Sequence, residues 1–273
     1  MPADRVGKHP YAMLPEGVRQ AIDDRVGADC PRTDIDVGTA SALSTLFFPS
    51  GAEKVFVKGL PLDHERVDEL KAEEAVNPFL PDCAPKLLWR AEAAGWLILG
   101  FYGTTATPWA WYASQSQHLE PIATVLRELS AYPAPDIGLP TAWDRWSDYC
   151  DPADEPLLRG DRLVHSDPAA SNFMMEPSGR AWLTDWSWAL RGPAWADAAL
   201  WGFRLILDGW QNPEQAATWA RSIPAFAQAD REAVVVLTEA EARAWEHMQE
   251  HGMTELEETI KAARAWADYW ASP

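Results

Sequence analysis

The sequence is poor in cysteine. Its 273 residues include only three, Cys30, Cys83 and Cys150, which are widely spaced and form no C-x-x-C pair. An odd number of separated cysteines argues against a disulfide framework and against a cysteine-based zinc site. This pattern fits a reducing compartment, and we expect a cytoplasmic protein.

Long apolar runs are also missing. No stretch reaches the roughly 18 apolar residues that would cross a bilayer. The N-terminal MPADRVGKHPYAML lacks the basic stretch followed by an apolar core that marks a secretion signal. We therefore expect a soluble protein without a membrane-spanning segment.

Basic residues are outnumbered. Lysine and arginine total 23 against 41 aspartates and glutamates, which gives a formal net charge of −18. Such a charge repels nucleic acid and anionic membranes, so neither is an expected partner. A cationic small molecule would be attracted, although surplus surface acid more often serves solubility alone.

The remaining composition is that of a globular protein. Hydrophobic residues make up 47% and charged residues 23%, and 16 tryptophans are present. Most of these tryptophans are expected in the core. The length allows one large domain or two lobes that share a cleft.

The N-terminal part is predicted to be rich in strands. GVRQAIDDRVG predicts a short helix that ends at Gly27. SALSTLFF and EKVFVKG, joined by PSG, predict a β-hairpin, and PKLLWRAE and GWLILGFYG predict two further strands. Between these pairs, HERVDELKAEEAVNPFL predicts a charged helix that ends by Pro78.

Beyond Gly103 the pattern is helical, with predicted helices near residues 116–131 and 193–208 and a long run from about 230 to the end. In that run, apolar residues recur at three- and four-residue steps, which indicates one face of a helix that packs in the core. They are Leu256, Ile260, Ala263, Trp266 and Trp270. Thr254 and Glu257 are spaced as a capping box.

The stretch LVHSDPAASNFMM and the following AWLTDWSWA contain the polar residues that best indicate chemistry. Mg²⁺ prefers oxygen ligands and usually bridges substrate phosphates, so a carboxamide such as Asn172 with a carboxylate such as Asp185 would suit it. The second carboxylate of the pair Asp167 and Asp185, held nearby but off the metal, could accept a proton from a hydroxyl. These groups match the needs of phosphoryl transfer to an alcohol.

A lysine and a pair of glutamates earlier in the sequence are further candidates for the site. Lys58 ends the strand-like VFVKG and could contact a phosphate, although a lysine in this pattern is more often the solvent face of a strand. Fifteen residues later, Glu73 and the adjacent Glu74 lie in the charged helix, and one of the two could pair with Lys58.

These motifs, and their order along the chain, resemble those of the aminoglycoside phosphotransferase and choline kinase family, the small-molecule branch of the protein-kinase-like fold. The likeness covers residues from about 35 to 205. It implies an α+β bilobal fold: a small β-rich lobe with one key helix (1–100, of which 1–34 is a leading segment), a hinge (101–104) and a larger, mainly helical lobe (105–273). The matching residues are Lys58, Glu73, His165, Asp167, Asn172, Asp185 and Asp197.

The resemblance implies a role for each residue. Asp167 would be the catalytic carboxylate, Asn172 and Asp185 would hold Mg²⁺, and Lys58, steadied by Glu73, would contact the phosphates of ATP; GTP is not excluded. His165 would support the catalytic loop, and Asp197 would cap backbone or anchor that loop. GTASALST around Ser41 corresponds to the phosphate-covering loop, and Gly100, Phe101 and Tyr102 in LGFYG to the hinge that contacts adenine.

The sequence also departs from the family pattern. The family usually has glycine where Ser166 stands, and the phosphate-covering loop contains a single glycine, Gly38. Trp186 after Asp185 is common in the small-molecule branch.

The leading functional hypothesis is an ATP- and Mg²⁺-dependent O-phosphotransferase that acts on a small molecule, for example an antibiotic. A metabolic kinase for choline or a sugar and a nucleotide-binding pseudoenzyme are the alternatives. The sequence determines neither the acceptor nor the oligomeric state.

Overall fold

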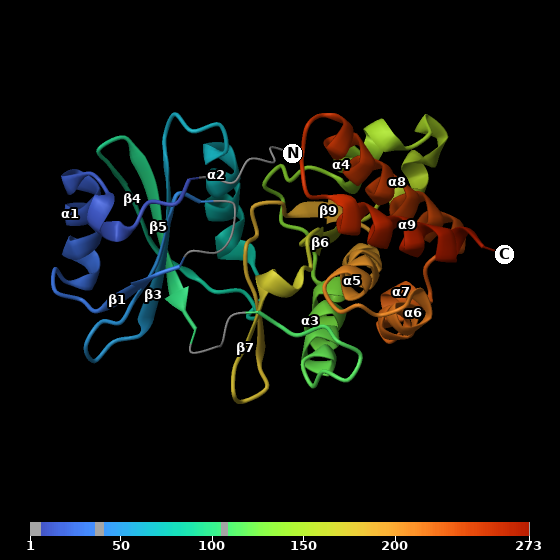
Figure 1. Ribbon diagram of the computed structural model, residues 1–273, viewed down its shortest axis with the longest axis horizontal. Coiled ribbons are helices and arrows are strands. Elements are labelled where there is room, and N and C mark those ends of the chain that lie inside the picture. Colours follow the sequence, from blue (N-terminus) through green and yellow to red (C-terminus); the bar gives the residue numbers. More distant parts are fainter. Residues whose placement is uncertain (1–6, 36–40, 105–108, 273) are drawn as a thin grey trace. The chain divides into compact units, whose positions relative to one another are not determined.

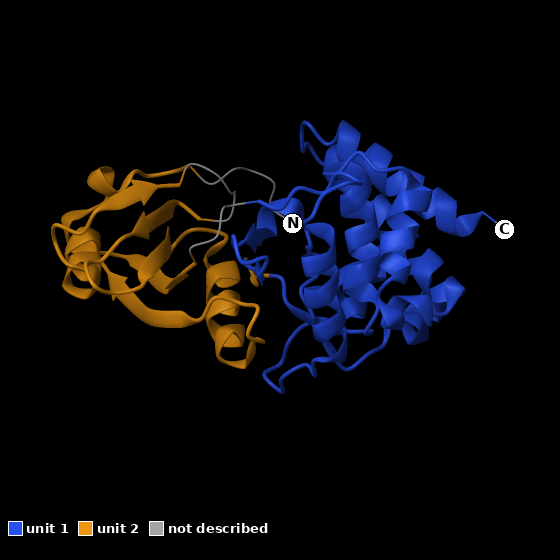
Figure 2. Ribbon diagram, turned by 90° about the horizontal axis from the view of Figure 1, so that it is seen from below, with its two compact units in different colours: residues 1, 107–184, 188–273 blue, residues 2–106, 185–187 orange. Residues whose placement is uncertain are grey.

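The computed structural model describes residues 7–35, 41–104 and 109–272. The chain divides into two compact units, shown in different colours in Figure 2. Residues 2–106 with 185–187 form one, called the sheet unit, and the remaining residues form the other, called the helical unit. Within the described ranges, no helix has both the length and the apolar composition needed to cross a bilayer.

The sheet unit contains a five-stranded antiparallel sheet in the order β1-β2-β3-β5-β4. The strands are β1 (Arg32–Asp34), β2 (Leu43–Phe47), β3 (Lys54–Pro61), β4 (Leu87–Ala93) and β5 (Trp96–Gly103). The predicted hairpin is confirmed, because Leu43 to Phe47 pair with Val55 to Gly59. The two later strands are confirmed as well, and a two-residue turn of Ala94 and Gly95, both at positive φ, joins them.

One helix covers each face of this sheet (Figure 1). Helix α1 (Glu16–Val26) buries Val18, Ile22 and Val26, which recur every four residues, and ends at Gly27 with φ 96° as predicted. On the other face lies α2 (Val67–Val76), followed by a 3₁₀ turn, η2 (Asn77–Phe79), at Pro78. Side chains alternate along β3, so Lys58 is directed to the face opposite the buried Val57.

The helical unit contains seven α-helices in the described residues. They are α3 (Leu119–Ala131), α4 (Ala142–Trp146), α5 (Ala196–Leu207), α6 (Pro213–Arg221), α7 (Pro224–Ala227), α8 (Arg231–Glu250) and α9 (Glu257–Ala271). Two short antiparallel pairs accompany them, β6 (Arg162–Val164) with β9 (Leu190–Gly192) and β7 (Phe173–Met175) with β8 (Ala181–Leu183). The helices predicted near 116–131 and 193–208 are confirmed as α3 and α5.

The predicted C-terminal run is divided into α8 and α9. Trp266 and Trp270 are buried, at 1% and 8% exposure, as expected for core residues. The predicted capping box is wrong: α9 begins at Glu257 with Leu256 as its N-cap, and no side chain caps it. Thr254 therefore precedes the helix by too many residues to reach its first turn.

The core of the helical unit depends on close contact between α5 and α9. The indole Nε1 of Trp266 donates to the carbonyl oxygen of Ala199 at 2.9 Å. Its ring also lies against Gly202, where an added Cβ would come within 2.2 Å of the ring. Glycine in the middle of a helix lowers its stability. Its presence in α5 is explained by the close contact of the Trp266 ring with the backbone at Gly202.

We predict that Gly202→Ala destabilises the protein. Alanine would stabilise α5 by about 1 kcal/mol through its higher helix propensity. However, its methyl group would clash with the buried Trp266 ring, and such overpacking costs about 1–3 kcal/mol. The free energy of unfolding in urea should therefore fall by up to about 2 kcal/mol. The control is Gly7→Ala, because nothing lies within 4 Å of its added Cβ. An increase in stability for Gly202→Ala would contradict the packing described here.

Candidate functional site

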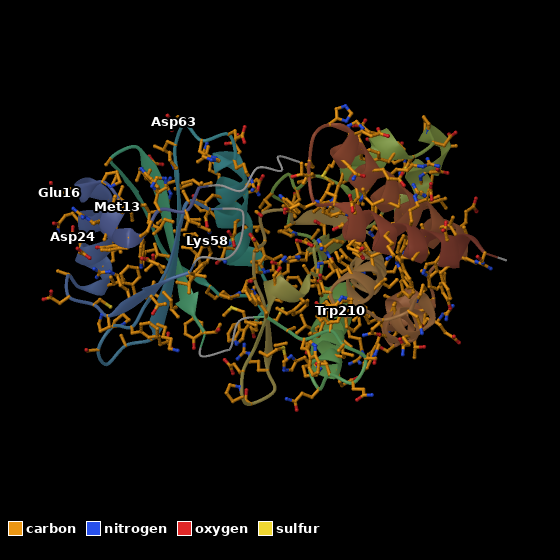
Figure 3. The ribbon with its side chains drawn as sticks, in the orientation of Figure 1. Met13, Glu16, Asp24, Lys58, Asp63 and Trp210 are labelled. Carbon is orange, nitrogen blue, oxygen red and sulfur yellow. The ribbon has the colours of Figure 1, made fainter. Side chains whose placement is uncertain are left out.

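Lys58, labelled in Figure 3, contacts two carboxylates in the sheet unit. Its Nζ is 3.1 and 3.0 Å from the two carboxylate oxygens of Glu73 on α2. The same nitrogen is 3.2 Å from Oδ1 of Asp185, which is 127 residues away in the sequence. Lys58 is thus in direct contact with two other residues predicted from the sequence, Glu73 and Asp185.

Glu73, and not Glu74, is the residue of α2 that points inward. Glu73 is 5% exposed, whereas Glu74 forms an ion pair with Arg90 at 2.8 Å. Consecutive helix residues point about 100° apart, so only one of the two could contact Lys58.

Electrostatics keep the Lys58 ammonium protonated. Burial is the largest influence and lowers the pKa of Lys58, but the carboxylates of Asp185 and Glu73 outweigh it and raise that pKa above its ordinary value. Burial also raises the pKa of Glu73, and Lys58 opposes this only in part. Loss of one partner would leave an uncompensated buried group, which is strongly destabilising.

Asp185 lies two residues after the end of β8. The preceding Thr184 donates its N–H to the carbonyl oxygen of Asn172 at 2.9 Å. Asp185 itself has φ 65°, a left-handed conformation that aspartate tolerates better than most residues. Its Oδ1 also accepts from Ser187 Oγ at 3.2 Å.

Asp167 and Asn172 are brought together in the loop between β6 and β7, in the helical unit. The 3₁₀ turn η5 (Ala170–Asn172) folds the chain back, so that Asn172 Nδ2 donates to both the Oδ2 and the main-chain oxygen of Asp167, at 3.0 and 2.9 Å. With its nitrogen used in this way, Asn172 presents its amide oxygen as the atom able to coordinate a cation.

Asp197 holds the beginning of this loop. It lies in the first turn of α5, is 6% exposed, and accepts from the backbone N–H groups of His165 at 2.9 Å and Ser166 at 2.8 Å. Burial raises the pKa of Asp197, and His165 and these hydrogen bonds oppose the rise. Of the two predicted roles, this geometry corresponds to the anchoring of the loop.

His165 links the loop to the end of β8. Its ring is fully buried, and its Nε2 is 2.9 Å from the carbonyl oxygen of Thr184. Its Nδ1 accepts from the backbone N–H of Asp167 at 3.2 Å, which places the ring proton on Nε2. These contacts orient the loop, as the predicted supporting role requires.

Arg204 on α5 was not predicted from the sequence, although it contacts Asp167 directly. Its Nη2 donates to Oδ1 of Asp167 at 2.6 Å, and its guanidinium lies over the rings of Phe203 and Trp245. Arg204 follows Asp197 by seven residues, about two helical turns, so both side chains are on one face of α5. That spacing was the available signal.

Asp208, just after α5, contacts the same loop. Its Oδ2 accepts from the backbone N–H of Ala170 at 3.0 Å. The region from Asp197 to Asp208 therefore contacts the loop at three places: the start of the loop, Asp167 and the 3₁₀ turn η5.

The residues predicted to form the hinge lie in a strand. Gly100, Phe101 and Tyr102 are residues of β5, which is paired with β3 on one side and β4 on the other. Tyr102 N–H, for example, donates to the carbonyl oxygen of Lys86 at 2.8 Å. Gly100 instead makes room for the indole of Trp89, since an added Cβ would lie 2.2 Å from that ring.

The predicted phosphate-covering loop is described only at its end. Gly38 lies outside the described residues. Ser41 is 4% exposed, and its hydroxyl is 2.8 Å from that of Ser44. This side chain is therefore engaged within the sheet unit.

Comparisons with known proteins give matches in structure alone. No family model matches the sequence, and no curated protein does. A thermostable aminoglycoside phosphotransferase APH(4)-Ia is 14% identical, with a TM-score of 0.62, covering 93% of this chain and 100% of that one. Choline kinase LicA from Streptococcus pneumoniae is 14% identical, with a TM-score of 0.57, covering 94% and 99%.

A third similar structure is spectinomycin phosphotransferase APH(9)-Ia in complex with ADP and spectinomycin. It is 10% identical, with a TM-score of 0.57, covering 92% of this chain and 93% of that one. At these identities the similarity concerns the fold. The predicted protein-kinase-like fold, and the resemblance to its small-molecule branch, are confirmed at that level.

We predict that Asp197→Asn destabilises the helical unit. The amide can accept from only one of the two backbone N–H groups and directs an N–H toward the other. Hydrogen bonds to a buried charge contribute about 1.5–3 kcal/mol, so the free energy of unfolding in urea should fall by about 2 kcal/mol. The exposed Asp161→Asn is the control. Equal stability of the two variants would contradict an anchoring role for Asp197.

Proposed function

We propose that the protein is a small-molecule kinase that transfers the γ-phosphoryl group of ATP to a hydroxyl group of its acceptor with the help of Mg²⁺. The main support is the contact of Lys58 with both Glu73 and Asp185. A lysine held by a helix glutamate, beside an aspartate that can bind a metal, is the arrangement that kinases use for nucleotide phosphates. The fold shared with choline kinase and two antibiotic phosphotransferases is consistent with this proposal.

On the nucleotide side, the protonated Lys58 would contact the α- and β-phosphates, and Glu73 would keep its side chain extended. The backbone at Ser41 would belong to the phosphate-covering loop. Contact of Gly100, Phe101 and Tyr102 of β5 with adenine stays a prediction. Similar structures were determined with ADP, AMP-PNP and AMP, which favours an adenine nucleotide.

Asn172 and Asp185 fit Mg²⁺ chemically, because the carboxamide oxygen and the carboxylate are the hard oxygen ligands that this ion prefers. When bound, Mg²⁺ would neutralise negative charge on the phosphates. The hydrogen bonds from Asn172 Nδ2 to Asp167 fix the orientation of the carboxamide in advance.

Asp167 would orient the acceptor hydroxyl and accept its proton. One carboxylate oxygen is held by Arg204 and the other by Asn172, so the group is fixed in orientation before the acceptor binds. Fixed orientation of a catalytic group reduces the entropy cost of reaching the transition state. Arg204 would act through Asp167 and is a positioning residue.

The acceptor is proposed only by class, as a small molecule with a free hydroxyl. Several of the similar structures contain hygromycin B or spectinomycin, and another is a choline kinase. An antibiotic-modifying enzyme and a metabolic kinase thus both stay open, and the net charge of −18 favours a cationic acceptor.

The proposal predicts that Lys58→Met and Asp167→Asn fail in different ways. Lys58→Met should lose affinity for Mg²⁺-ATP, because its ammonium is the phosphate contact. Asp167→Asn should bind Mg²⁺-ATP normally but transfer phosphate about 10²–10⁴-fold more slowly, the usual contribution of a general base. The measurements are calorimetric titration with ATP and a mass-spectrometric screen of hydroxyl-bearing acceptors for one added phosphoryl group.

Asp136→Asn, an exposed substitution, is the control and should behave as wild type. Wild-type protein that binds ATP but phosphorylates no acceptor in the screen would favour the pseudoenzyme alternative. Unchanged transfer by Asp167→Asn would refute the assignment of the catalytic carboxylate.

Arg204 provides a second prediction. Arg204→Met should lower kcat by about 10-fold or more and leave the KM for ATP unchanged, because it releases Asp167 without touching the nucleotide residues. Arg204→Lys should recover part of kcat, since an ammonium restores the charge but not the planar geometry of the guanidinium. A fall in ATP affinity with unchanged kcat would instead assign Arg204 to nucleotide binding.

A further inference from the structure

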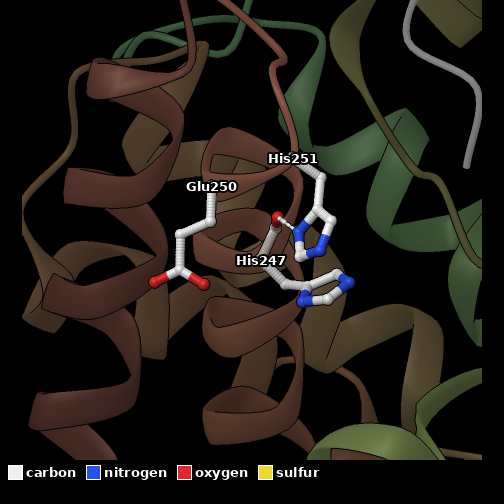
Figure 4. Close-up of side chains that lie close together, drawn as sticks. All are labelled: His247, Glu250 and His251. Carbon is white, nitrogen blue, oxygen red and sulfur yellow. Dashed lines mark hydrogen bonds between the residues drawn. The ribbon is translucent and has the colours of Figure 1, made fainter.

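Three exposed side chains at the end of α8 form a cluster separate from the residues discussed above. They are His247, Glu250 and His251, and one potential ligand atom from each lies within 4.8 Å of the others. Figure 4 shows the two imidazole rings and the glutamate on the last turn of the helix. The spacing of three and four residues places these side chains on neighbouring positions of the helix surface.

The backbone fixes this turn. Gly252 has φ 97°, its N–H donates to the carbonyl oxygen of Gln249 at 3.1 Å, and Met253 N–H donates to that of Met248 at 3.1 Å. This pair of bonds is the Schellman motif that ends many helices. His251 is the C-cap residue inside the motif, so its Cα position is determined and only its side chain can rotate.

The orientation of His251 suits a metal ligand. Its Nδ1 donates to the carbonyl oxygen of His247 at 2.8 Å, shown as a dashed line in Figure 4. A proton on Nδ1 leaves the lone pair on Nε2 for coordination, and metal-binding histidines commonly donate their other nitrogen to a carbonyl oxygen in this way. The ring of His247 lies beside it, with the centroids 3.9 Å apart.

Glu250 is available as the third ligand. Among the described residues it has no hydrogen bond or ion pair, whereas the nearby Glu246 is held by Arg264 at 2.6 Å. A helix residue is expected to pair with an oppositely charged neighbour where one is present. The carboxylate of Glu250 instead adds negative charge beside two imidazoles, which favours a cation at this place.

We propose that His247, Glu250 and His251 bind one divalent transition-metal ion of the Zn²⁺ type, with water as the fourth ligand. Two imidazoles and one carboxylate form a known three-ligand set for zinc. Mg²⁺ prefers oxygen ligands, so this site is chemically distinct from the proposed Mg²⁺ ligands. Bonds of about 2.0–2.1 Å in tetrahedral geometry require ligand atoms about 3.4 Å apart, which rotation of exposed side chains can provide.

The expected effect of the ion is local stabilisation. The three residues approach one another only when the last turn of α8 is helical, so an ion bound there stabilises the folded state by mass action. His247 also contacts the ring of Tyr149 in η3 (Ser147–Tyr149), edge to face, at 5.7 Å between centroids. An ordered His247 would therefore also restrain η3.

The test uses the untagged full-length protein, stripped with EDTA and dialysed. Calorimetric titration with ZnCl₂ should show one equivalent bound, and the thermal unfolding temperature should rise with Zn²⁺. His247→Ala and His251→Ala should each weaken binding at least 10-fold, and Glu250→Gln should weaken it less. The control is His9→Ala, which removes an exposed histidine elsewhere and should bind Zn²⁺ as the wild type does.

The double variant His247→Ala/His251→Ala gives the decisive outcome. Both histidines are exposed, so the variant should fold and unfold normally in EDTA, and it should show no rise in unfolding temperature with Zn²⁺. Absence of Zn²⁺ binding by the wild type, or equal binding by this double variant, would overturn the proposal. Titration of Co²⁺ gives an independent readout, since its visible spectrum reports tetrahedral coordination in the wild type.

Discussion

An ammonium group removed from water costs several kcal/mol unless nearby carboxylates compensate for the loss of solvation. Lys58 has two such carboxylates, Glu73 from α2 and Asp185 from the segment after β8. Their charges keep the lysine protonated despite its burial. The contact also fixes three separate parts of the chain, β3, α2 and the segment 185–187, as one charged cluster in the sheet unit.

In the helical unit, α5 has the corresponding organising role. Through Asp197 it holds the start of the loop that carries Asp167, and through Arg204 it holds the carboxylate of Asp167 itself. The position of α5 depends in turn on Gly202 and Ala199, which contact Trp266 of α9. The C-terminal helices, which carry no motif, thus influence the geometry of the proposed catalytic loop.

Much of the fold and of the candidate site could be predicted because it depends on local patterns. The hairpin of β2 and β3 follows from alternating residues around a turn, and Asp167 and Asn172 are close in sequence as well as in space. The local pattern alone left Glu73 and Glu74 open, because the choice depends on the rotation of α2 against the sheet, and the family resemblance selected Glu73. Arg204 was missed because its partner, Asp167, is 37 residues away.

The family resemblance assigned LGFYG to the hinge, and the structure places Gly100 within β5, where a ring packed from the neighbouring strand requires a glycine. A tertiary contact of this kind produces no recognisable pattern in the local sequence. The capping box failed for a related reason, since the spacing of Thr254 and Glu257 cannot show where α9 begins.

Ser166 bears on whether the loop is competent for catalysis. It has φ 69°, a left-handed conformation that costs a residue other than glycine about 1–2 kcal/mol. This explains why glycine is usual at this position in the family that the sequence resembles. Here the Ser166 hydroxyl donates to the carbonyl oxygen of Trp188 at 2.7 Å, and its N–H donates to Asp197.

Only the hydroxyl bond is specific to serine, and its contribution of about 1 kcal/mol is similar in size to the strain. Serine therefore preserves the loop conformation that glycine would allow, and Asp167 keeps its contacts with Arg204 and Asn172. The departure from glycine changes how the loop is stabilised and removes none of the groups that the proposed reaction needs. It thus gives little support to a pseudoenzyme, and the identity of the acceptor is the more informative question.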